Sequence, residues 1–118
     1  MKKLIYLFTV FACINTVNAQ NYIAYYQNCN KGDSLLYIKQ KKEALKYYLK
    51  ADSMVNYTHI KYLMNIAYLS SEENKLEVCN NSLISALEQG MEFKKIKFRK
   101  LQNFKNSENY KKFIKNKE

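Results

Sequence analysis

The sequence predicts an all-α protein in which antiparallel helical hairpins stack into a short α-α superhelix that ends in a C-terminal closing hairpin. Two observations carry this prediction. The 118 residues include no proline and only two glycines, so the residues that usually interrupt helices or mark strand turns are almost absent. Apolar residues also recur at intervals of three and four, the periodicity of one helix face, and no alternating strand pattern of useful length occurs.

Residues 1–19 have the features of a secretory signal peptide and are set apart from the fold. Lys2 and Lys3 form a basic start, residues 4–14 are apolar, and the small residue Ala19 offers a cleavage site. The apolar run is about half of the roughly 20 residues that a membrane span requires. We therefore expect export, to the periplasm or beyond, with no transmembrane span once the signal peptide is removed.

The three cysteines allow two further interpretations. Cys13 raises the alternative of a lipoprotein in which this cysteine becomes the acylated first residue, but Phe11 departs from the small-residue pattern that precedes a lipidated cysteine. Cys29 and Cys79 are able to pair in an exported protein. However, Cys79 takes the small-residue place that Ala44 has in the first hairpin, so we expect a core thiol rather than a disulfide.

The mature chain, residues 20–118, is expected to form one domain that begins with a hairpin over about 22–53. Its first helix is predicted over 22–38, where tyrosine, cysteine and leucine side chains follow one stripe. The polar residues 39–42 then form the turn. The second helix carries its apolar residues from Ala44 to about Ser53.

A second hairpin is predicted over about 58–89. Thr58 is the expected N-cap of its first helix. Ser70 with Glu73 fits a capping box for the start of its second helix, and the small-residue signal Gly90 ends that helix. A closing element over about 92–116 follows, with Ser107 as an N-cap, and we expect it to cover the last open face of the stack.

A spaced set of small and bulky residues occurs twice, and its members lie thirty-five positions apart. In each set the last three members share one helix face, and the first lies twelve residues upstream on the preceding helix. Small residues let two helices approach closely, and the bulky residue fills the remaining space. The two sets are Gly32, Ala44, Tyr48 and Ala51, then Ala67, Cys79, Leu83 and Ala86.

This spacing resembles the small, small, aromatic, small positions of the tetratricopeptide repeat. The chain is also similar to small secreted tetratricopeptide-like proteins of Bacteroidetes bacteria, over about 90 residues. The resemblance implies a protein-binding scaffold that has no chemistry of its own.

No catalytic, cofactor or metal site is predicted. The single histidine, His59, stands at an expected helix start with no nucleophile paired to it, so an exposed or capping role is favoured. The carboxylates Glu72, Glu73 and Glu77 are spread over a helix start, where acidic side chains favour the helix dipole.

Two sets of residues are candidates for binding a partner. Tyr37 and Tyr62 lie on the first helices of the two hairpins and are candidates for a peptide groove, with plain packing as the alternative. Residues 91–118 carry nine Lys and one Arg against three Glu, a balance of +7, while residues 20–90 carry only +1. The basic candidates are Lys94, Lys95, Lys97, Arg99 and Lys100.

Two functions follow as expectations. The first is a non-catalytic exported scaffold that binds a protein or peptide. The alternative is an electrostatic binder of an anionic envelope polymer or membrane surface through residues 91–118. However, the phenylalanines of this segment recur at the spacing of a buried stripe, which favours lysines that lie on a solvated outer face. Nucleic acid is not expected as a partner of an exported protein.

Overall fold

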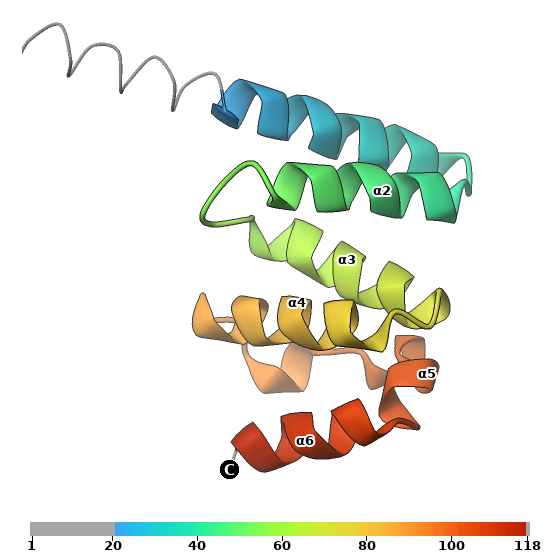
Figure 1. Ribbon diagram of the computed structural model, residues 1–118, viewed down its shortest axis with the longest axis vertical. Helices are drawn as coiled ribbons and strands as arrows, with labels where there is room; N and C mark the ends of the chain where they lie inside the picture. Colours follow the sequence, from blue (N-terminus) through green and yellow to red (C-terminus); the bar gives the residue numbers. More distant parts are fainter. Residues whose placement is uncertain (1–20, 118) are drawn as a thin grey trace, which may run out of the picture.

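The computed structural model describes residues 21–117, all of whose regular structure is helical. The predicted signal peptide and Cys13 lie outside this range. The N-terminal helix (residues 21–37) is followed in the stack of Figure 1 by the other helices in chain order. These are α2 (Lys41–Asp52), α3 (Ile60–Glu72), α4 (Leu76–Glu88), the short 3-10 helices η1 (Phe93–Lys95) and η2 (Phe98–Lys100), α5 (Gln102–Lys105) and α6 (Glu108–Lys117).

The all-α prediction is confirmed, and the long helices pair as two hairpins joined by the same kind of turn. Lys39 and Asn74, thirty-five positions apart, both have positive φ angles, of 63° and 61°. After Lys39, the Gln40 amide donates to the Leu35 carbonyl at 2.9 Å. The corresponding bond in the second hairpin, from Lys75 to Ser70, measures 2.8 Å. Both turns therefore end a helix with a left-handed residue and a reach-back hydrogen bond, which satisfies carbonyls at the helix end.

Gly90 ends α4 as predicted. Its φ angle of 103° lies in the left-handed region, where a residue without a side chain carries no steric penalty. The next amide, that of Met91, donates to the Ala86 carbonyl at 3.1 Å. The chain consequently turns sharply out of α4 into the closing segment.

The predicted capping box of Ser70 and Glu73 is wrong. Ser70 lies within α3, is fully buried, and donates its hydroxyl hydrogen bond to the Ile66 carbonyl one turn earlier. That bond satisfies the hydroxyl group, so the small side chain of Ser70 is accommodated inside α3 and the helix continues past it. The helix runs on to Glu72, and α4 starts after Lys75, which makes no side-chain cap.

The predicted N-cap at Thr58 is also shifted, by one residue. His59 is the N-cap of α3, and its Nδ1 accepts a hydrogen bond from the Lys61 amide at 3.1 Å. Thr58 is buried instead, where its hydroxyl donates to the Asp52 carboxylate and its carbonyl accepts from the Gln89 side chain at 2.9 Å. Thr58 thereby fixes the loop between the hairpins, while His59 takes the capping role expected of it.

All eight repeat positions are buried, and the first pair shows why a glycine occurs there. A Cβ added at Gly32 would lie 2.6 Å from Cε1 of the fully buried Tyr48 ring. The ring therefore occupies the space that a side chain on the N-terminal helix would need. In the second hairpin the corresponding residues are Ala67 and Leu83, and both are fully buried. Where the first helix has alanine in place of glycine, the facing residue is thus leucine in place of the larger tyrosine.

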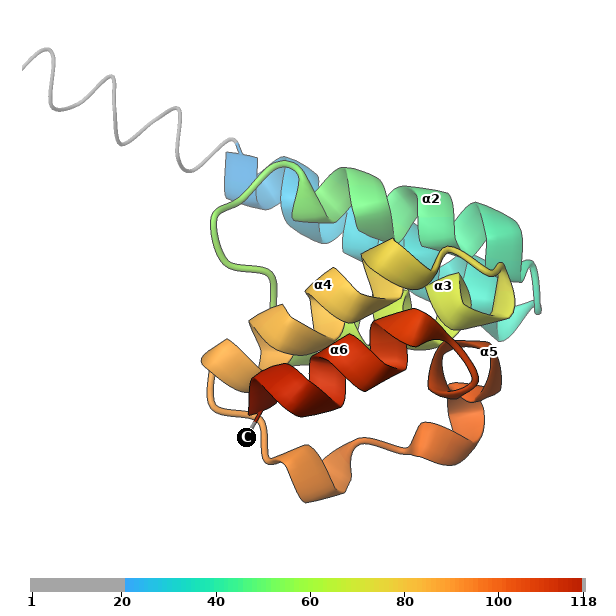
Figure 2. The ribbon, with the colours of Figure 1, turned by 60° about the horizontal axis from the view of Figure 1, so that its bottom comes forward.

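The closing element differs from the predicted hairpin in its first arm. Only the second arm, α6, is a helix of ten residues, and its start is capped by Ser107, whose Oγ accepts from the Tyr110 amide at 3.4 Å. The first arm consists of η1, η2 and the four-residue α5. Figure 2 shows this arm crossing below the stack before α6 returns along α4. Buried Leu101 and Phe104 anchor it to α3 and α4.

Cys29 and Cys79 are both free and buried, in separate apolar clusters. Burial raises the pKa of the Cys79 thiol from 9.0 to about 12, and a hydrogen bond with Ser70 opposes this shift. The folded state therefore favours the neutral thiol. This contribution to stability is complete below about pH 9 and is lost as the pH rises from about 9 toward 12.

We expect Cys79→Ala to reduce the pH dependence of unfolding. Alanine is the residue at the corresponding position of the first hairpin, Ala44. At pH 7 the smaller side chain should cost about 1 kcal/mol of unfolding free energy. Between about pH 8 and pH 10 the variant should lose about 1 kcal/mol less than the unsubstituted protein, because position 79 no longer carries a thiol that ionises on unfolding. Urea unfolding under reducing conditions measures both values, and equal alkaline losses would contradict the assignment.

Candidate binding groove

A surface hollow of about 460 Å³ lies where four segments of the chain meet. The end of the N-terminal helix, the start of α2, the second half of α3 and η2 each contribute side chains to its wall. Its volume falls within the range of about 300–1,000 Å³ that ligand pockets have. The lining residues are Leu36, Lys41, Asn65, Tyr68, Leu69, Glu72, Arg99 and Lys100.

The basic side of the hollow is held in place by η2. Phe98 and Leu101 are three residues apart and lie on the same side of this 3-10 turn. Phe98 is half-buried and Leu101 is fully buried. Arg99 and Lys100, between them, are exposed. Two apolar residues thus anchor the turn and leave two cations facing outward.

Tyr68 of α3 fixes the same turn from the other side. Its hydroxyl oxygen accepts a hydrogen bond from the Lys97 amide at 3.3 Å. The Lys100 ammonium lies 5.5 Å from the centroid of the Tyr68 ring, within the range of a cation–π contact. Tyr68 therefore joins the closing segment to the second hairpin at the edge of the hollow.

The charges around the hollow are unequal. Lys41 of α2 and Glu72 of α3 form an ion pair at 3.2 Å. Within residues 21–117, Arg99 and Lys100 have no carboxylate at ion-pair distance. After the Lys41–Glu72 pair is subtracted, two positive charges remain on the wall.

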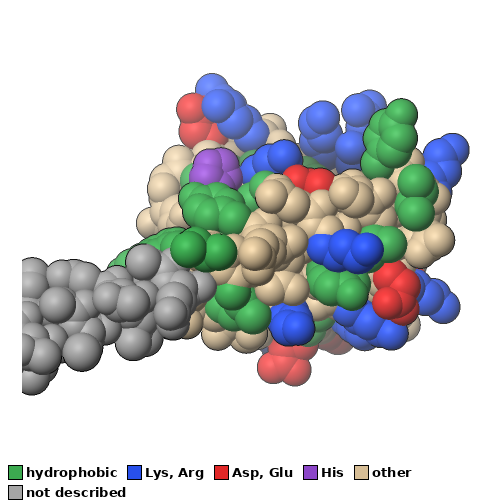
Figure 3. Space-filling view, turned by 90° about the horizontal axis from the view of Figure 1, so that it is seen from above, with side chains coloured by type: hydrophobic (Ala, Val, Ile, Leu, Met, Phe, Trp, Pro, Cys, Tyr) green, Lys and Arg blue, Asp and Glu red, His purple; other side chains and the backbone are tan. Residues whose placement is uncertain are grey.

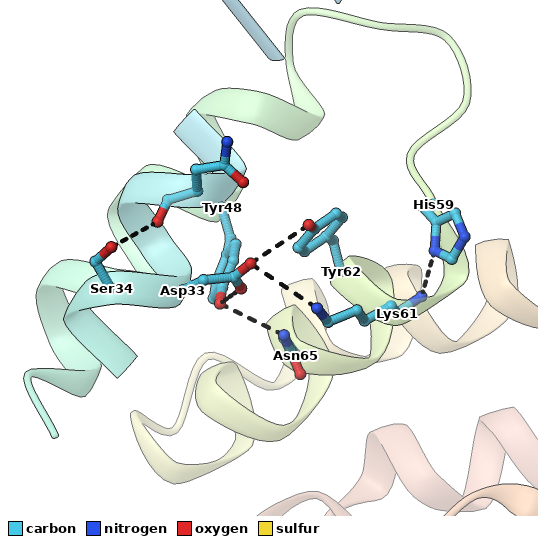
Figure 4. Close-up of polar contacts among 8 residues, drawn as sticks. Asp33, Ser34, Tyr48, His59, Lys61, Tyr62 and Asn65 are labelled. Atoms are coloured by element: carbon cyan, nitrogen blue, oxygen red, sulfur yellow. Dashed lines mark hydrogen bonds and ion pairs between the residues drawn. The ribbon is translucent and has the colours of Figure 1, made fainter. Parts of the chain in front are cut away.

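A second polar group centres on Asp33 (Figure 4). One carboxylate oxygen accepts from the Tyr48 hydroxyl at 2.6 Å, and the other accepts from the Tyr62 hydroxyl at 3.4 Å. The Lys61 ammonium lies 3.8 Å from that second oxygen, and the Asn65 amide donates to the Tyr48 hydroxyl at 3.5 Å. Burial, followed by the Asp33 contact, raises the pKa of Tyr48, so this hydroxyl stays protonated and donates to the carboxylate.

The two candidate tyrosines lie in different environments. Tyr37 is 88% exposed and follows Leu36, which lines the hollow. Tyr62 is half-buried, with its ring centroid 5.7 Å from that of Tyr48 and 6.3 Å from that of Tyr25. Tyr62 is thus part of the packing between the hairpins, whereas Tyr37 is free to contact a partner.

Of the five basic candidates, the structure brings only Arg99 and Lys100 into the hollow. Lys94 pairs with Glu92 at 3.1 Å, and Lys95 and Lys97 are exposed without lining it. Sequence reasoning missed Lys41 and Tyr68, which come from other parts of the chain.

Tyr68 had a usable signal in the sequence. It directly follows the small repeat residue Ala67, as Asp33 directly follows Gly32. Both Asp33 and Tyr68 form hydrogen bonds with residues of other helices or segments. In each hairpin, the residue after the small repeat residue therefore contacts a neighbouring element. Lys41 had no comparable signal, because its place depends on how the second hairpin packs against the first turn.

The groups considered for chemistry do not converge. His59 is exposed and is the purple side chain at the surface in Figure 3. Glu72 forms an ion pair with Lys41, and Glu73 forms one with Lys42 at 4.0 Å. Among residues 21–117 no group of three or more His, Cys, Asp or Glu side chains is placed to hold a metal ion. None of the described helices is both long enough and apolar enough to cross a membrane.

The start of the N-terminal helix has a contrasting surface. Tyr22, Ile23 and Tyr26 are 46%, 59% and 55% exposed, and residues 21–30 contain no charged side chain. Figure 3 shows hydrophobic side chains on this side of the molecule, with basic side chains farther along it. The apolar surface and the basic hollow therefore lie at opposite ends of the same helix.

In comparisons with protein-family models, curated proteins and solved structures, nothing matches this chain. Its architecture is an all-helical domain of paired helices. The hollow at the junction of the hairpins and the closing segment is the feature on which a functional proposal can be based.

Proposed function

We propose that the hairpins form a short tetratricopeptide-like superhelix that acts as an exported, non-catalytic scaffold and binds a protein or peptide partner. The observation that carries this proposal is the hollow of about 460 Å³ to which four separate segments contribute side chains. A site assembled from several rigid helices holds its shape without a ligand, which lowers the entropic cost of binding.

The composition of the hollow suits a peptide. Leu36, Leu69 and the Tyr68 ring offer apolar contact area, and charged side chains stand around them. Protein-binding surfaces commonly combine an apolar centre with a polar rim. Tyr37, the residue after Leu36, exposes a rigid aromatic ring of the kind that contributes strongly to such interfaces.

Site-specific crosslinking tests this proposal at Tyr37. A photoreactive phenylalanine analogue replaces Tyr37 in the full-length chain, which is expressed in its native cells and irradiated. We expect a covalent adduct with a discrete protein, because the Tyr37 side chain is 88% exposed and directly follows Leu36, which lines the hollow.

The matched control carries the same analogue at Tyr57, which is 74% exposed in the loop between α2 and α3 and does not line the hollow. The Tyr57 adduct should be absent or much weaker. Equal adducts at both positions, or none at Tyr37, would contradict a partner-binding role for this groove.

A further inference from the structure

We propose that the hollow is a site for an acidic peptide segment, one that places carboxylates on Arg99 and Lys100 and an apolar side chain between Leu36 and Leu69. This inference rests on the proposed scaffold function and specifies the chemistry of the partner. Its basis is the charge left on the wall after Lys41 pairs with Glu72.

The turn that carries the two unbalanced cations is held in place before any ligand binds. Fully buried Leu101 anchors the turn that carries them, and the Tyr68 hydroxyl accepts from the Lys97 amide at 3.3 Å. Cations on a fixed turn lose less conformational freedom on binding than cations on a free tail. Carboxylate recognition by Arg also gains from paired, charge-assisted hydrogen bonds.

A peptide fits this site better than a lipid surface does. The cations of the hollow stand beside apolar side chains in a concave wall, which matches alternating acidic and apolar residues. A flat anionic membrane would instead meet the outer face of α6, where Lys112 and Lys115 are exposed and have no carboxylate at ion-pair distance in the described part of the chain. The two surfaces can therefore be tested separately.

Two double variants with equal loss of charge make this separation. Arg99→Gln/Lys100→Gln removes both cations of the hollow, and Lys112→Gln/Lys115→Gln removes two from α6. All four side chains are exposed, so neither variant disturbs the core. A third variant, Arg99→Lys/Lys100→Arg, keeps the charge and controls for damage to the turn.

Each purified protein is immobilised, incubated with a library of short randomised peptides, and washed, and the retained peptides are sequenced. The unsubstituted protein should retain peptides enriched in Asp and Glu beside apolar residues. The hollow variant should retain roughly tenfold less of them, while the α6 variant and the charge-retaining variant stay within about twofold of the unsubstituted protein.

Three outcomes would overturn the inference. Retained peptides without acidic enrichment would leave the scaffold function standing and remove the acidic ligand. Equal losses in the hollow and α6 variants would show general electrostatic attraction. Phosphatidylglycerol vesicles that displace the retained peptides, and that no longer bind the hollow variant, would make lipid headgroups the occupant. If no peptide is retained and Tyr37 forms no adduct, the proposed function itself fails.

Discussion

Gly32→Ala is expected to destabilise the protein by about 2 kcal/mol, although alanine is the better helix former. The added Cβ would lie 2.6 Å and 2.8 Å from two carbons of the Tyr48 ring. That ring is fully buried, and its hydroxyl donates to Asp33 at 2.6 Å, so it has little freedom to move away. Urea unfolding followed by circular dichroism measures the change in unfolding free energy.

The second hairpin shows how the cost should be relieved. Its corresponding residues are Ala67 and Leu83, so an alanine is accommodated where the bulky partner is leucine. In a Tyr48→Leu background, Gly32→Ala should therefore be neutral or stabilise the protein by up to about 1 kcal/mol. This reversal of sign is a direct test of size complementarity between the two positions.

Gly90→Ala is the matched control for this cycle. Gly90 has a φ angle of 103° and no atom within 4 Å of an added Cβ, so its substitution strains the backbone and crowds nothing. Its cost, about 1–2 kcal/mol, should be the same with either residue at position 48. If the Gly32→Ala cost also persists with leucine at position 48, the Tyr48 ring is not its cause.

The pairing of the helices into stacked hairpins is the part of the fold that the sequence predicted best. Helix packing depends on local periodicity and on the sizes of facing residues, and both are visible in the spacing from Gly32 to Ala51 and from Ala67 to Ala86. The helix stop at Gly90 was predictable for a similar reason, since the residue type and the backbone conformation are linked.

The errors occurred where a local motif competed with tertiary packing. Ser70 has the sequence pattern of a cap, but its small side chain is needed inside α3, where the Ile66 carbonyl accepts its hydrogen bond. The left-handed conformations of Lys39 and Asn74 were similarly hidden, because neither residue is a glycine although both have positive φ. Local patterns alone do not show which of these demands is stronger.

The candidate site was predictable only in part. Arg99 and Lys100 stand out in a basic segment, but so do three other candidates that do not line the hollow. What distinguishes the two is the anchoring of Leu101 and the contact with Tyr68, which are long-range features of the fold. Lys41 joins them from α2, more than fifty positions earlier in the chain.

Phe104→Ala should give the largest loss of stability, about 3–5 kcal/mol of unfolding free energy. Phe104 is fully buried, and its ring centroid lies 5.9 Å from that of Tyr110 and 5.8 Å from that of Phe113, both on α6. Its backbone amide donates to the Ser71 hydroxyl at 3.2 Å, a bond that alanine retains. The loss should therefore come from the cavity and the freed aromatic rings, and hydrogen exchange should rise first in α6.

The same substitution should weaken acidic-peptide retention in the surviving folded protein. Phe104 and Leu101 are the two fully buried anchors of the segment that carries Arg99 and Lys100, so loosening one of them lets those cations move away from Tyr68. Ile38→Ala is the control, since Ile38 is 57% exposed and its removal should change stability by no more than about 0.5 kcal/mol. If Phe104→Ala is as stable as Ile38→Ala, the closing segment is not held by this core. The fixed geometry that we assign to the hollow would then have no structural basis.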